Sequence, residues 1–355
     1  MPLPNENSKE WKEEVNKYVG STIEYRNKRS KELGYKDRNS FQTVMERRGI
    51  GVGAVDKEDK DGKIELPPVK ISEYKPTKTK NGDEETQVVL LSDGHAGKIT
   101  QSFNKITYQK RMETVFQSIV TIANLHRHMY PINKLRIIDL GDNCQGENPH
   151  QGSVVGEIEM GARDQTIKIA TPAWNDLLGS LKQHFSEVIF DGFPGNHGYE
   201  KFAPETSRED LRLYDILQVG IGREKGITIN IHEQFADIID IEGYKFFCFH
   251  GDGIPCQQGV PQMAIERRLK SWYIQYGGFN YACGAHFHKR LTNEIAAGVE
   301  YFMNASLVSD DMWALKKLGI SSQPSQWTFG VHSKRGITWR YPLIVDYKFL
   351  PLVGR

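Results

Sequence analysis

Cysteine is scarce in this sequence, and so are the features that would place the chain in a membrane or outside the cell. The four cysteines among 355 residues are scattered without Cys-x-x-Cys spacing, which favours reduced thiols over a disulfide framework. No apolar run approaches the ~20 residues that a membrane span requires, and segment 1–6 lacks the basic-then-apolar layout of a signal peptide. These absences predict a cytoplasmic protein with no membrane partner.

Neither the net charge nor a search for internal repeats indicates a class of function. The formal net charge is +1, which favours no class of partner, and no segment of the sequence repeats another. The composition does permit a full hydrophobic core, because 38% of the 355 residues are hydrophobic. This length favours one large domain plus a smaller one.

The most informative stretch is 88–95, where the apolar run Val-Val-Leu-Leu is followed by Asp93 and His95. A strand alternates its side chains with period two, so these two residues should project together from its C-terminal end, where open α/β sheets bind ligands. Taken alone, an Asp-Gly-His sequence after a strand is more often a surface turn. The pattern is therefore half of a metal site, and the rest of the chain must complete it.

The same layout recurs twice in the following residues. Segment 104–128 has an apolar helical face and leads to a strand at 135–140, which ends in Gly-Asp-Asn with Asp142 in the middle. A helical region at 173–184 then precedes a strand at 188–193, which is followed by Asn196 and His197. Each strand therefore delivers a potential metal ligand at its C-terminal end.

Two further strands, at 245–249 and 281–284, are also followed by histidines. A lone histidine at a strand end is more often a hydrogen-bonded turn residue, but five such strand ends in succession favour one metal centre. Oxygen and imidazole donors without thiolate suit two divalent transition ions that share one carboxylate. The candidate ligands are Asp93, His95, Asp142, Asn196, His250, His286 and His288.

These strand ends resemble the motifs of the calcineurin-like metallophosphoesterases, which run Asp-x-His, Gly-Asp, Gly-Asn-His, His and Gly-x-His-x-His. All five are present in that order between residues 93 and 288, and the resemblance extends over about residues 86–347. Segment 250–288 and the later Asn304-Ala305-Ser306 look most like phage and prophage members, which implies the cytoplasm of a bacterium or phage-infected host. The implied fold is α/β, with two mixed β-sheets packed face to face and flanked by helices.

The resemblance also implies how the ligands divide between two divalent ions. Manganese is the expected metal, with Zn²⁺, Fe²⁺ or Mg²⁺ as alternatives. Asp142 would bridge the two ions. The first ion would take Asp93, His95, Asp142 and His288, and the second would take Asp142, Asn196, His250 and His286.

His197 lies next to a ligand but outside the ligand set, so it has a different expected role. Two cations would lower the pKa of a bridging water and hold a phosphate oxygen, while His197 would donate a proton to the leaving alkoxide. The alternative is a hydrogen bond that only supports the ligands. Gly198 follows this histidine where relatives often have an acid, which leaves Glu200 and Asp191 as candidates for orienting it.

The N-terminal residues 1–50 are expected to form a small helical domain, followed by a polar linker at 51–85 and the phosphoesterase domain at 86–355. A capping box at 21–24 opens a helix that should stop at Gly34, and a third helix should begin near residue 40. This pattern predicts a helix-turn-helix, and eight Lys or Arg lie between residues 21 and 50. Arg38, Arg47 and Arg48 are candidate DNA contacts. A helical hairpin with a solvated charged surface is the alternative.

The predicted function is hydrolysis of a phosphoester, with the DNA backbone as the leading substrate. Besides the N-terminal helices, a basic helix with Arg267, Arg268 and Lys270 could follow a phosphate backbone. The alternatives are a phosphatase or small-molecule phosphodiesterase, and a DNA-binding protein with a vestigial phosphoesterase domain.

A homo-oligomer is compatible with the sequence. A helix at 310–318 and strands at 327–332 and 337–347 are expected to complete the second sheet.

Overall fold

The computed structural model of the chain describes residues 13, 17, 23–36, 83–147, 157–199, 204, 206–255, 261–296, 298–311, 315, 319 and 322–346. The chain divides into two compact units, Met1–Leu66 with Val154–Glu159, and Pro67–Ser153 with Met160–Arg355. Among the described residues, no helix is long and apolar enough to cross a membrane. The predicted boundaries at residues 50 and 85 stay predictions.

Helix α2 (Ile23–Glu32) is the described helix of the first unit. It ends as expected at Gly34, which has a φ of +82°, and the Tyr35 amide donates to the Ser30 carbonyl at 2.9 Å. Glycine adopts this left-handed conformation without steric cost, which explains why the helix stops there. The predicted third helix lies outside the described residues, as do Arg38, Arg47 and Arg48.

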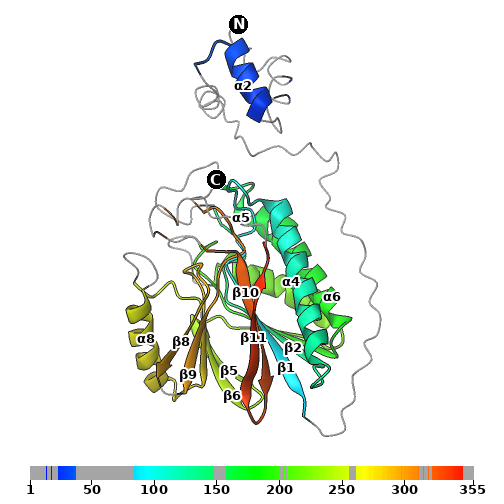
Figure 1. The fold of residues 1–355 in the computed structure, drawn as a ribbon, viewed down its shortest axis with the longest axis vertical. Coiled ribbons are helices and arrows are strands. Elements are labelled where there is room, and N and C mark those ends of the chain that lie inside the picture. Colours follow the sequence, from blue (N-terminus) through cyan, green and yellow to red (C-terminus); the bar gives the residue numbers. More distant parts are fainter. Residues whose placement is uncertain are drawn as a thin grey trace. The chain divides into compact units, whose positions relative to one another are not determined.

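The second unit contains two mixed β-sheets, which confirms the predicted fold class (Figure 1). The six-stranded sheet has the order β11-β10-β1-β2-β3-β4 and the five-stranded sheet the order β5-β6-β7-β9-β8. Strands β1 to β4 are mutually parallel, and β6, β7 and β9 are mutually parallel. The strands are β1 (Glu85–Leu91), β2 (Lys134–Asp139), β3 (Glu187–Gly192), β4 (Ile227–Ile231), β5 (Ala236–Ile241), β6 (Tyr244–Phe249), β7 (Tyr281–Gly284), β8 (Leu291–Ala296), β9 (Val299–Met303), β10 (Ser325–His332) and β11 (Gly336–Ile344).

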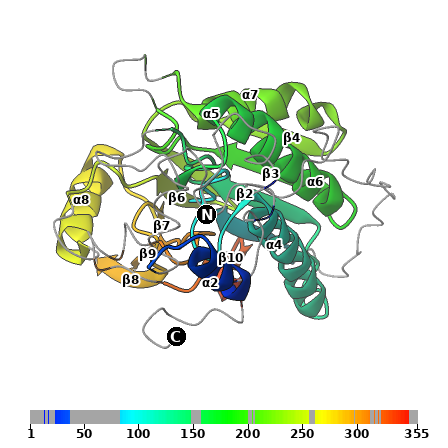
Figure 2. The same cartoon turned by 90° about the horizontal axis from the view of Figure 1, so that it is seen from above.

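Helices cover the outer face of each sheet, so the unit has four layers (Figures 1 and 2). Helices α4, α6 and α7 pack on the six-stranded sheet, whereas α8 packs on the five-stranded sheet. Asn104 caps α4 by accepting a hydrogen bond from the Thr107 amide. The helical segments are α4 (Lys105–His126), α5 (Ala162–Asp164), the π-helix η2 (Gln165–Ala170), α6 (Thr171–Lys182), α7 (Glu209–Val219), the 3₁₀ helix η3 (Ile221–Arg223) and α8 (Gln262–Gln275).

The alternation of strand β1 explains how the layers form. Val88 and Leu90 are buried in the core between the two sheets, whereas Val89 and Leu91 are buried against the helices. A strand with apolar side chains on both faces must be covered on both faces, which is the usual environment of a parallel strand. The apolar run that stood out in the sequence is therefore the centre of the six-stranded sheet.

The C-terminal strands were predicted to complete the second sheet, and that prediction is wrong. Strand β10 pairs antiparallel with β1, from Glu85 opposite His332 to Leu90 opposite Trp327, and β11 pairs with β10. Both strands therefore extend the first sheet. Alternating hydrophobicity identifies a strand, but the pairing depends on which edge is open, and here the free edge of β1 was open. Most of the helix predicted at 310–318 lies outside the described residues.

A polar cluster around the buried Asp191 of β3 joins the two sheets. Arg136 donates to both carboxylate oxygens of Asp191, and His232 lies 3.2 Å from Asp191 and 3.0 Å from Asp237. Burial alone would lower the pKa of His232, but hydrogen bonds to Asp191 and Asp237 raise it above its ordinary value. Asp191 therefore belongs to this cluster.

Candidate metal centre

All seven predicted ligands lie at one end of the two sheets, because parallel strands present their carboxyl ends at the same edge. In the six-stranded sheet, residues after β1, β2 and β3 supply Asp93, His95, Asp142 and Asn196. In the five-stranded sheet, residues after β6 and β7 supply His250, His286 and His288. The structure therefore brings together side chains that are up to 195 positions apart in the sequence.

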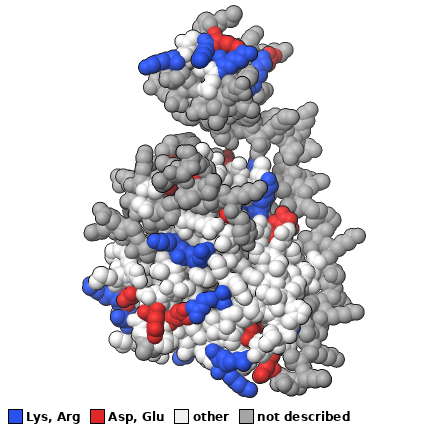
Figure 3. All heavy atoms as spheres, viewed as in Figure 1, with Lys and Arg blue, Asp and Glu red and all other residues white. Residues whose placement is uncertain are grey.

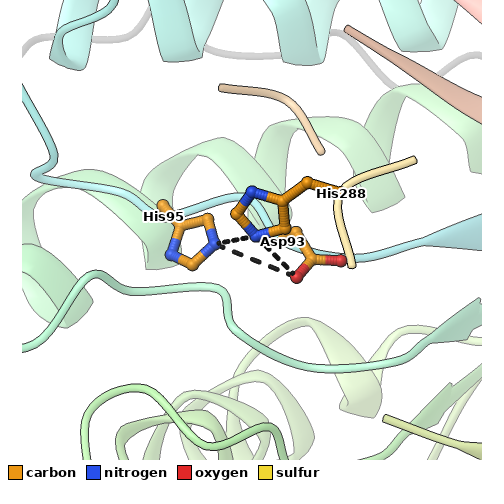
Figure 4. A group of neighbouring side chains, drawn as sticks. All are labelled: Asp93, His95 and His288. Atoms are coloured by element: carbon orange, nitrogen blue, oxygen red, sulfur yellow. Dashed lines mark hydrogen bonds and ion pairs between the residues drawn. The ribbon is translucent and has the colours of Figure 1, made fainter. Parts of the chain in front are cut away.

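The first group of ligands is Asp93, His95 and His288 (Figure 4). The Nε2 atoms of His95 and His288 are 3.0 Å apart, and Asp93 Oδ1 lies 3.2 Å from His288 Nε2 and 3.9 Å from His95 Nε2. Asp93 and His95 are completely buried. Their polar atoms therefore converge on one small region instead of pointing to solvent.

The second group contains Asp142, Asn196, His250 and His286. His250 Nε2 lies 3.1 Å from Asp142 Oδ2, 3.0 Å from Asn196 Oδ1 and 3.3 Å from His286 Nδ1. His250 Nδ1 faces the Leu140 carbonyl at 2.7 Å, and because a carbonyl only accepts, Nδ1 carries the proton. In a neutral imidazole this leaves Nε2 with a free lone pair that points at the group.

The spacing of these atoms fits metal coordination. Ligand atoms that each lie about 2.0–2.1 Å from one ion are separated from one another by about 3–3.4 Å. The contacts within the two groups, apart from the 3.9 Å pair, lie between 3.0 and 3.3 Å. In addition, Asp93 Oδ1 and Asp142 Oδ2 are buried without a hydrogen-bond donor among the described residues. Buried carboxylate oxygens require a cation or donor, so the residues present fit divalent ions.

Asp142 belongs to two possible metal groups, and residues of both ligand groups are among its partners. It forms a possible metal group with His250 and His286, and another with His95 and His197. Oxygen and nitrogen donors without sulfur suit manganese, iron or zinc, and do not distinguish among them. The ligand roles of the seven residues stay a prediction.

The backbone is strained at five of the predicted ligands. Asp93, His95, Asp142, His286 and His288 have φ values between 46° and 70°, in the left-handed region. Only two other non-glycine residues of the described chain, Glu242 and Asp310, share this conformation. Each such residue costs roughly 1–2 kcal/mol relative to a right-handed conformation. Strain concentrated at one set of residues is typical of functional sites, where the surrounding structure holds side chains in a required geometry.

Two glycines allow the ligand loops to approach each other. A Cβ atom on Gly141 would lie 2.2 Å from the Gly195 amide nitrogen, and one on Gly195 would lie 2.1 Å from Asp142 Oδ1. Gly141 also has a φ of +87°. The glycines that precede Asp142 and Asn196 are therefore required by close packing of backbone against backbone.

Asp210 in α7 holds these two loops in place, and no sequence pattern identified it. Its Oδ2 accepts hydrogen bonds from the amides of Asp142 at 3.0 Å and Gly195 at 2.8 Å. Its Oδ1 accepts from the amide of Asn143 at 2.9 Å and from the Asn143 side chain at 3.0 Å. An acid in the first turn of a helix usually interacts with the helix dipole, so its sequence position gave no signal.

Gln165 is a second positioning residue that the sequence did not reveal. Its side chain accepts from the Gly146 amide at 2.9 Å and donates to the Gly146 carbonyl at 3.1 Å, a pairing like that of two strands. It also packs so closely on Gly97 that a Cβ atom there would lie 2.4 Å away. Gln165 begins the π-helix η2, a rare conformation that is common near functional sites.

His197 lies at the centre of the site, with Nε2 3.9 Å from Asp142 Oδ2 and its ring 4.5 Å from the ring of His95. Its Nδ1 faces the Gln145 carbonyl at 3.0 Å and therefore carries a proton. This backbone carbonyl orients the ring. The expectation that Asp191 orients it is wrong, because Asp191 pairs with Arg136 and His232, and Glu200 lies outside the described residues.

Charge interactions in the site shift several pKa values. Burial lowers the pKa of His286 to about 4, with a contribution from the neighbouring His250. Burial would also lower the pKa of His250, but the Asp142 carboxylate raises it to about 10. Burial would raise the pKa of Asp142, yet the nearby histidines hold it well below its ordinary value. The carboxylates are thus ionised, and a cation bound by His250 would replace the proton with which this ring pairs with Asp142.

The candidate DNA contacts Arg267 and Arg268 lie on α8, where both are exposed, as is Lys270. They are free to meet a phosphate backbone. On the face of the second unit in Figure 3, the described basic side chains form separate groups with acidic and uncharged side chains between them. This face therefore carries no continuous basic band among the described residues.

No protein-family model matches this chain, and no curated protein matches its sequence. Solved structures of similar fold include a predicted phosphoesterase from Streptococcus pneumoniae, with 8% identity, 73% of this chain and 97% of that chain covered, and a TM-score of 0.29. Zinc-bound Vps29 from Entamoeba histolytica has 12% identity and a TM-score of 0.32, and the match covers 73% of this chain and 99% of Vps29. A 5′-nucleotidase from Candida albicans has 10% identity and a TM-score of 0.35, and the match covers 74% of this chain and 52% of the nucleotidase. TM-scores this low carry no functional argument.

Proposed function

We propose that this protein is a metal-dependent phosphoester hydrolase of the calcineurin-like type. The observation that supports this most strongly is the convergence of two ligand groups on Asp142, with contacts of 3.0–3.3 Å within them and two buried carboxylate oxygens that lack donors. Such a site does not stabilise the fold, because buried charges and strained backbone both lower stability. Binding of two divalent ions accounts for both features.

In this proposal, one set of residues binds the metal ions and another set positions the loops that carry them. Asp93, His95 and His288 would hold one ion, Asn196, His250 and His286 would hold the other, and Asp142 would bind both. When bound, the ions neutralise phosphate charge and supply a nucleophile at neutral pH. Asp210 and Gln165 keep the ligand loops in register through their backbone groups.

His197 is the proposed general acid. Its Nδ1–H donates to the Gln145 carbonyl, which directs Nε2 toward Asp142 and the ligand groups. A protonated Nε2 can then donate to the oxygen of the leaving group as the phosphorus–oxygen bond breaks. The low exposure of His197, 5%, keeps this proton transfer away from bulk water.

The proposed substrate is a DNA phosphodiester. Support comes from exposed Arg267, Arg268 and Lys270 on α8, and from the basic residues of segment 21–50. The rival is a phosphatase or small-molecule phosphodiesterase, which would need none of these basic residues. A protein without activity and with a vestigial site is the remaining alternative.

The deciding experiment offers the purified protein linear and circular DNA, bis(p-nitrophenyl) phosphate and p-nitrophenyl phosphate, each with Mn²⁺, Zn²⁺, Mg²⁺ or EDTA. We expect hydrolysis of DNA and of the diester with a metal and none with EDTA. Activity confined to the monoester would identify a phosphatase. If the wild type and Asp142→Asn are equally inactive with all metals, the proposed hydrolase activity is wrong.

Deletion of residues 1–51 separates catalysis from DNA targeting, because every proposed ligand follows residue 86. The truncated protein should keep its activity on bis(p-nitrophenyl) phosphate. Its affinity for duplex DNA should fall, and the salt dependence of binding should become weaker, because up to eight basic side chains that release counterions are removed. Equal affinity and equal salt slope in both proteins would refute DNA binding by the N-terminal segment.

A further inference from the structure

Arg290 is a partly buried arginine that has no anionic partner among the described residues, and it lies two residues after the predicted ligand His288. Its Nη1 atom is buried and has no hydrogen-bond partner among the residues that the structure describes. Its guanidinium lies over the indole of Trp327, 5.7 Å from the ring centre. A buried N–H group without an acceptor is costly, so the missing partner of Nη1 requires an explanation.

Other arginines of the same unit have the acceptors that Arg290 lacks. Arg111 donates to Ser309 and Asp346, Arg127 to the Ile132 carbonyl, and Arg136 to Asp191. These side chains show that the fold normally satisfies its buried guanidinium groups. Arg290 differs from them in its position at the edge of the candidate metal centre.

Strand pairing fixes that position. Arg290 directly precedes β8, whose first residue, Leu291, lies opposite Met303, and Met303 lies opposite Gly284 at the end of β7. The ligands His286 and His288 follow directly after β7. Trp327 is held at the same edge, because its Nε1 donates to the Met303 carbonyl at 2.9 Å. Two residues span at most about 7 Å of backbone, so the backbone of Arg290 lies within that distance of the backbone of His288.

We propose that Arg290 binds a second, non-scissile phosphate of the substrate. The proposal rests on the proposed hydrolase function and adds a substrate class, namely phosphodiesters that carry a further phosphate next to the one that is cut. A guanidinium pairs with phosphate through charge-assisted hydrogen bonds, and the Trp327 ring supports it from the other side. A substrate with a single phosphate does not use this residue.

The test compares Arg290→Gln and Arg290→Lys with wild type and with Lys289→Gln, which removes the same charge from the exposed neighbouring residue. The substrates are thymidine 5′-(p-nitrophenyl phosphate), which has one phosphate, and a short oligothymidylate, which has several. For Arg290→Gln we expect KM on the oligonucleotide to rise about tenfold to a hundredfold, the range for one lost charge-assisted hydrogen bond, with kcat unchanged. KM on the single-phosphate ester should not change. Arg290→Lys should recover part of the loss.

Oligonucleotide binding in a salt series, with thermal unfolding of each variant, provides a measurement that does not depend on turnover. Arg290→Gln should reduce the salt slope by about one phosphate contact, whereas Lys289→Gln should not. An equal rise of KM on both substrates, or an unchanged affinity and slope with a lower Tm, would show that Arg290 only supports Trp327 and would overturn the proposal. If the wild type hydrolyses neither substrate, the hydrolase proposal fails, and the binding comparison still decides the role of Arg290.

Discussion

Replacing Asp210 by asparagine should loosen the metal centre while every proposed ligand side chain stays in place. The carboxylate accepts four hydrogen bonds from N–H groups of Asp142, Asn143 and Gly195, two on each oxygen. An asparagine side chain has one acceptor oxygen and one NH₂ group, which must face two of these N–H donors. Two buried donors therefore lose their acceptor.

The magnitude follows from those two lost bonds. A buried donor without an acceptor costs about 1–3 kcal/mol, so the substitution should cost roughly 2–6 kcal/mol. Part of this is offset, because burial and the Asp142 charge raise the pKa of Asp210, and asparagine removes that unfavourable charge. We expect roughly 2–4 kcal/mol, which at about 2–4 °C per kcal/mol lowers Tm by roughly 4–16 °C.

The assay is calorimetric unfolding with excess Mn²⁺ and with EDTA, together with a metal titration. Asp215→Asn is the matched control, because Asp215 lies on the same helix and is exposed. Asp210→Asn should also bind metal more weakly, since the loops that carry Asp142 and Asn196 lose their common support. A Tm and a metal affinity equal to those of Asp215→Asn would refute the positioning role of Asp210.

Three further predictions concern single side chains. Asp142→Asn should reduce occupancy of both metal ions, whereas Asn196→Ala should mainly reduce the second, and metal analysis after dialysis distinguishes them. His197→Ala should keep both ions but lose roughly 10²–10⁴-fold in kcat on esters with poor leaving groups, and less on aryl esters, which need no proton. His232→Gln should destabilise the protein most below about pH 6.5 and progressively less as pH rises through the raised pKa of His232, because only the protonated ring gains from its carboxylate partners. Urea unfolding of both proteins at several pH values measures this difference.

The strands and their terminal ligands were predictable because the signal is local. A short β-branched run such as Val88–Leu91 predicts a buried strand, and the residue types at its end indicate what the strand presents at the sheet edge. The order of five such ends was enough to group residues as distant as Asp93 and His288. Their side chains meet within 3.2 Å because parallel strands share a carboxyl edge, which is a rule of topology and not of sequence distance.

The supporting residues were not predictable, because their roles depend on tertiary contacts alone. Asp210 and Gln165 act on backbone amides, and the orienting partner of His197 is a backbone carbonyl that any residue at position 145 would supply. The same limit explains the wrong placement of β10, since its alternating pattern suits either sheet. Sequence therefore identified the side chains that the structure brings together in the candidate metal centre, and not the groups that hold them in place.

Backbone strain is evidence for functional residues that does not depend on the distances between side chains. If Asp93, His95, Asp142, His286 and His288 were only turn residues, glycine would relieve the left-handed strain at each position, and the fold would gain stability. Burial of the ionised carboxylates of Asp93 and Asp142 adds a second cost at two of these positions. Cation binding would offset both costs, because it would give Asp93 Oδ1 and Asp142 Oδ2 the partner that they lack among the described residues. The strain and the unsatisfied oxygens therefore both support the proposed binding of divalent ions at this site.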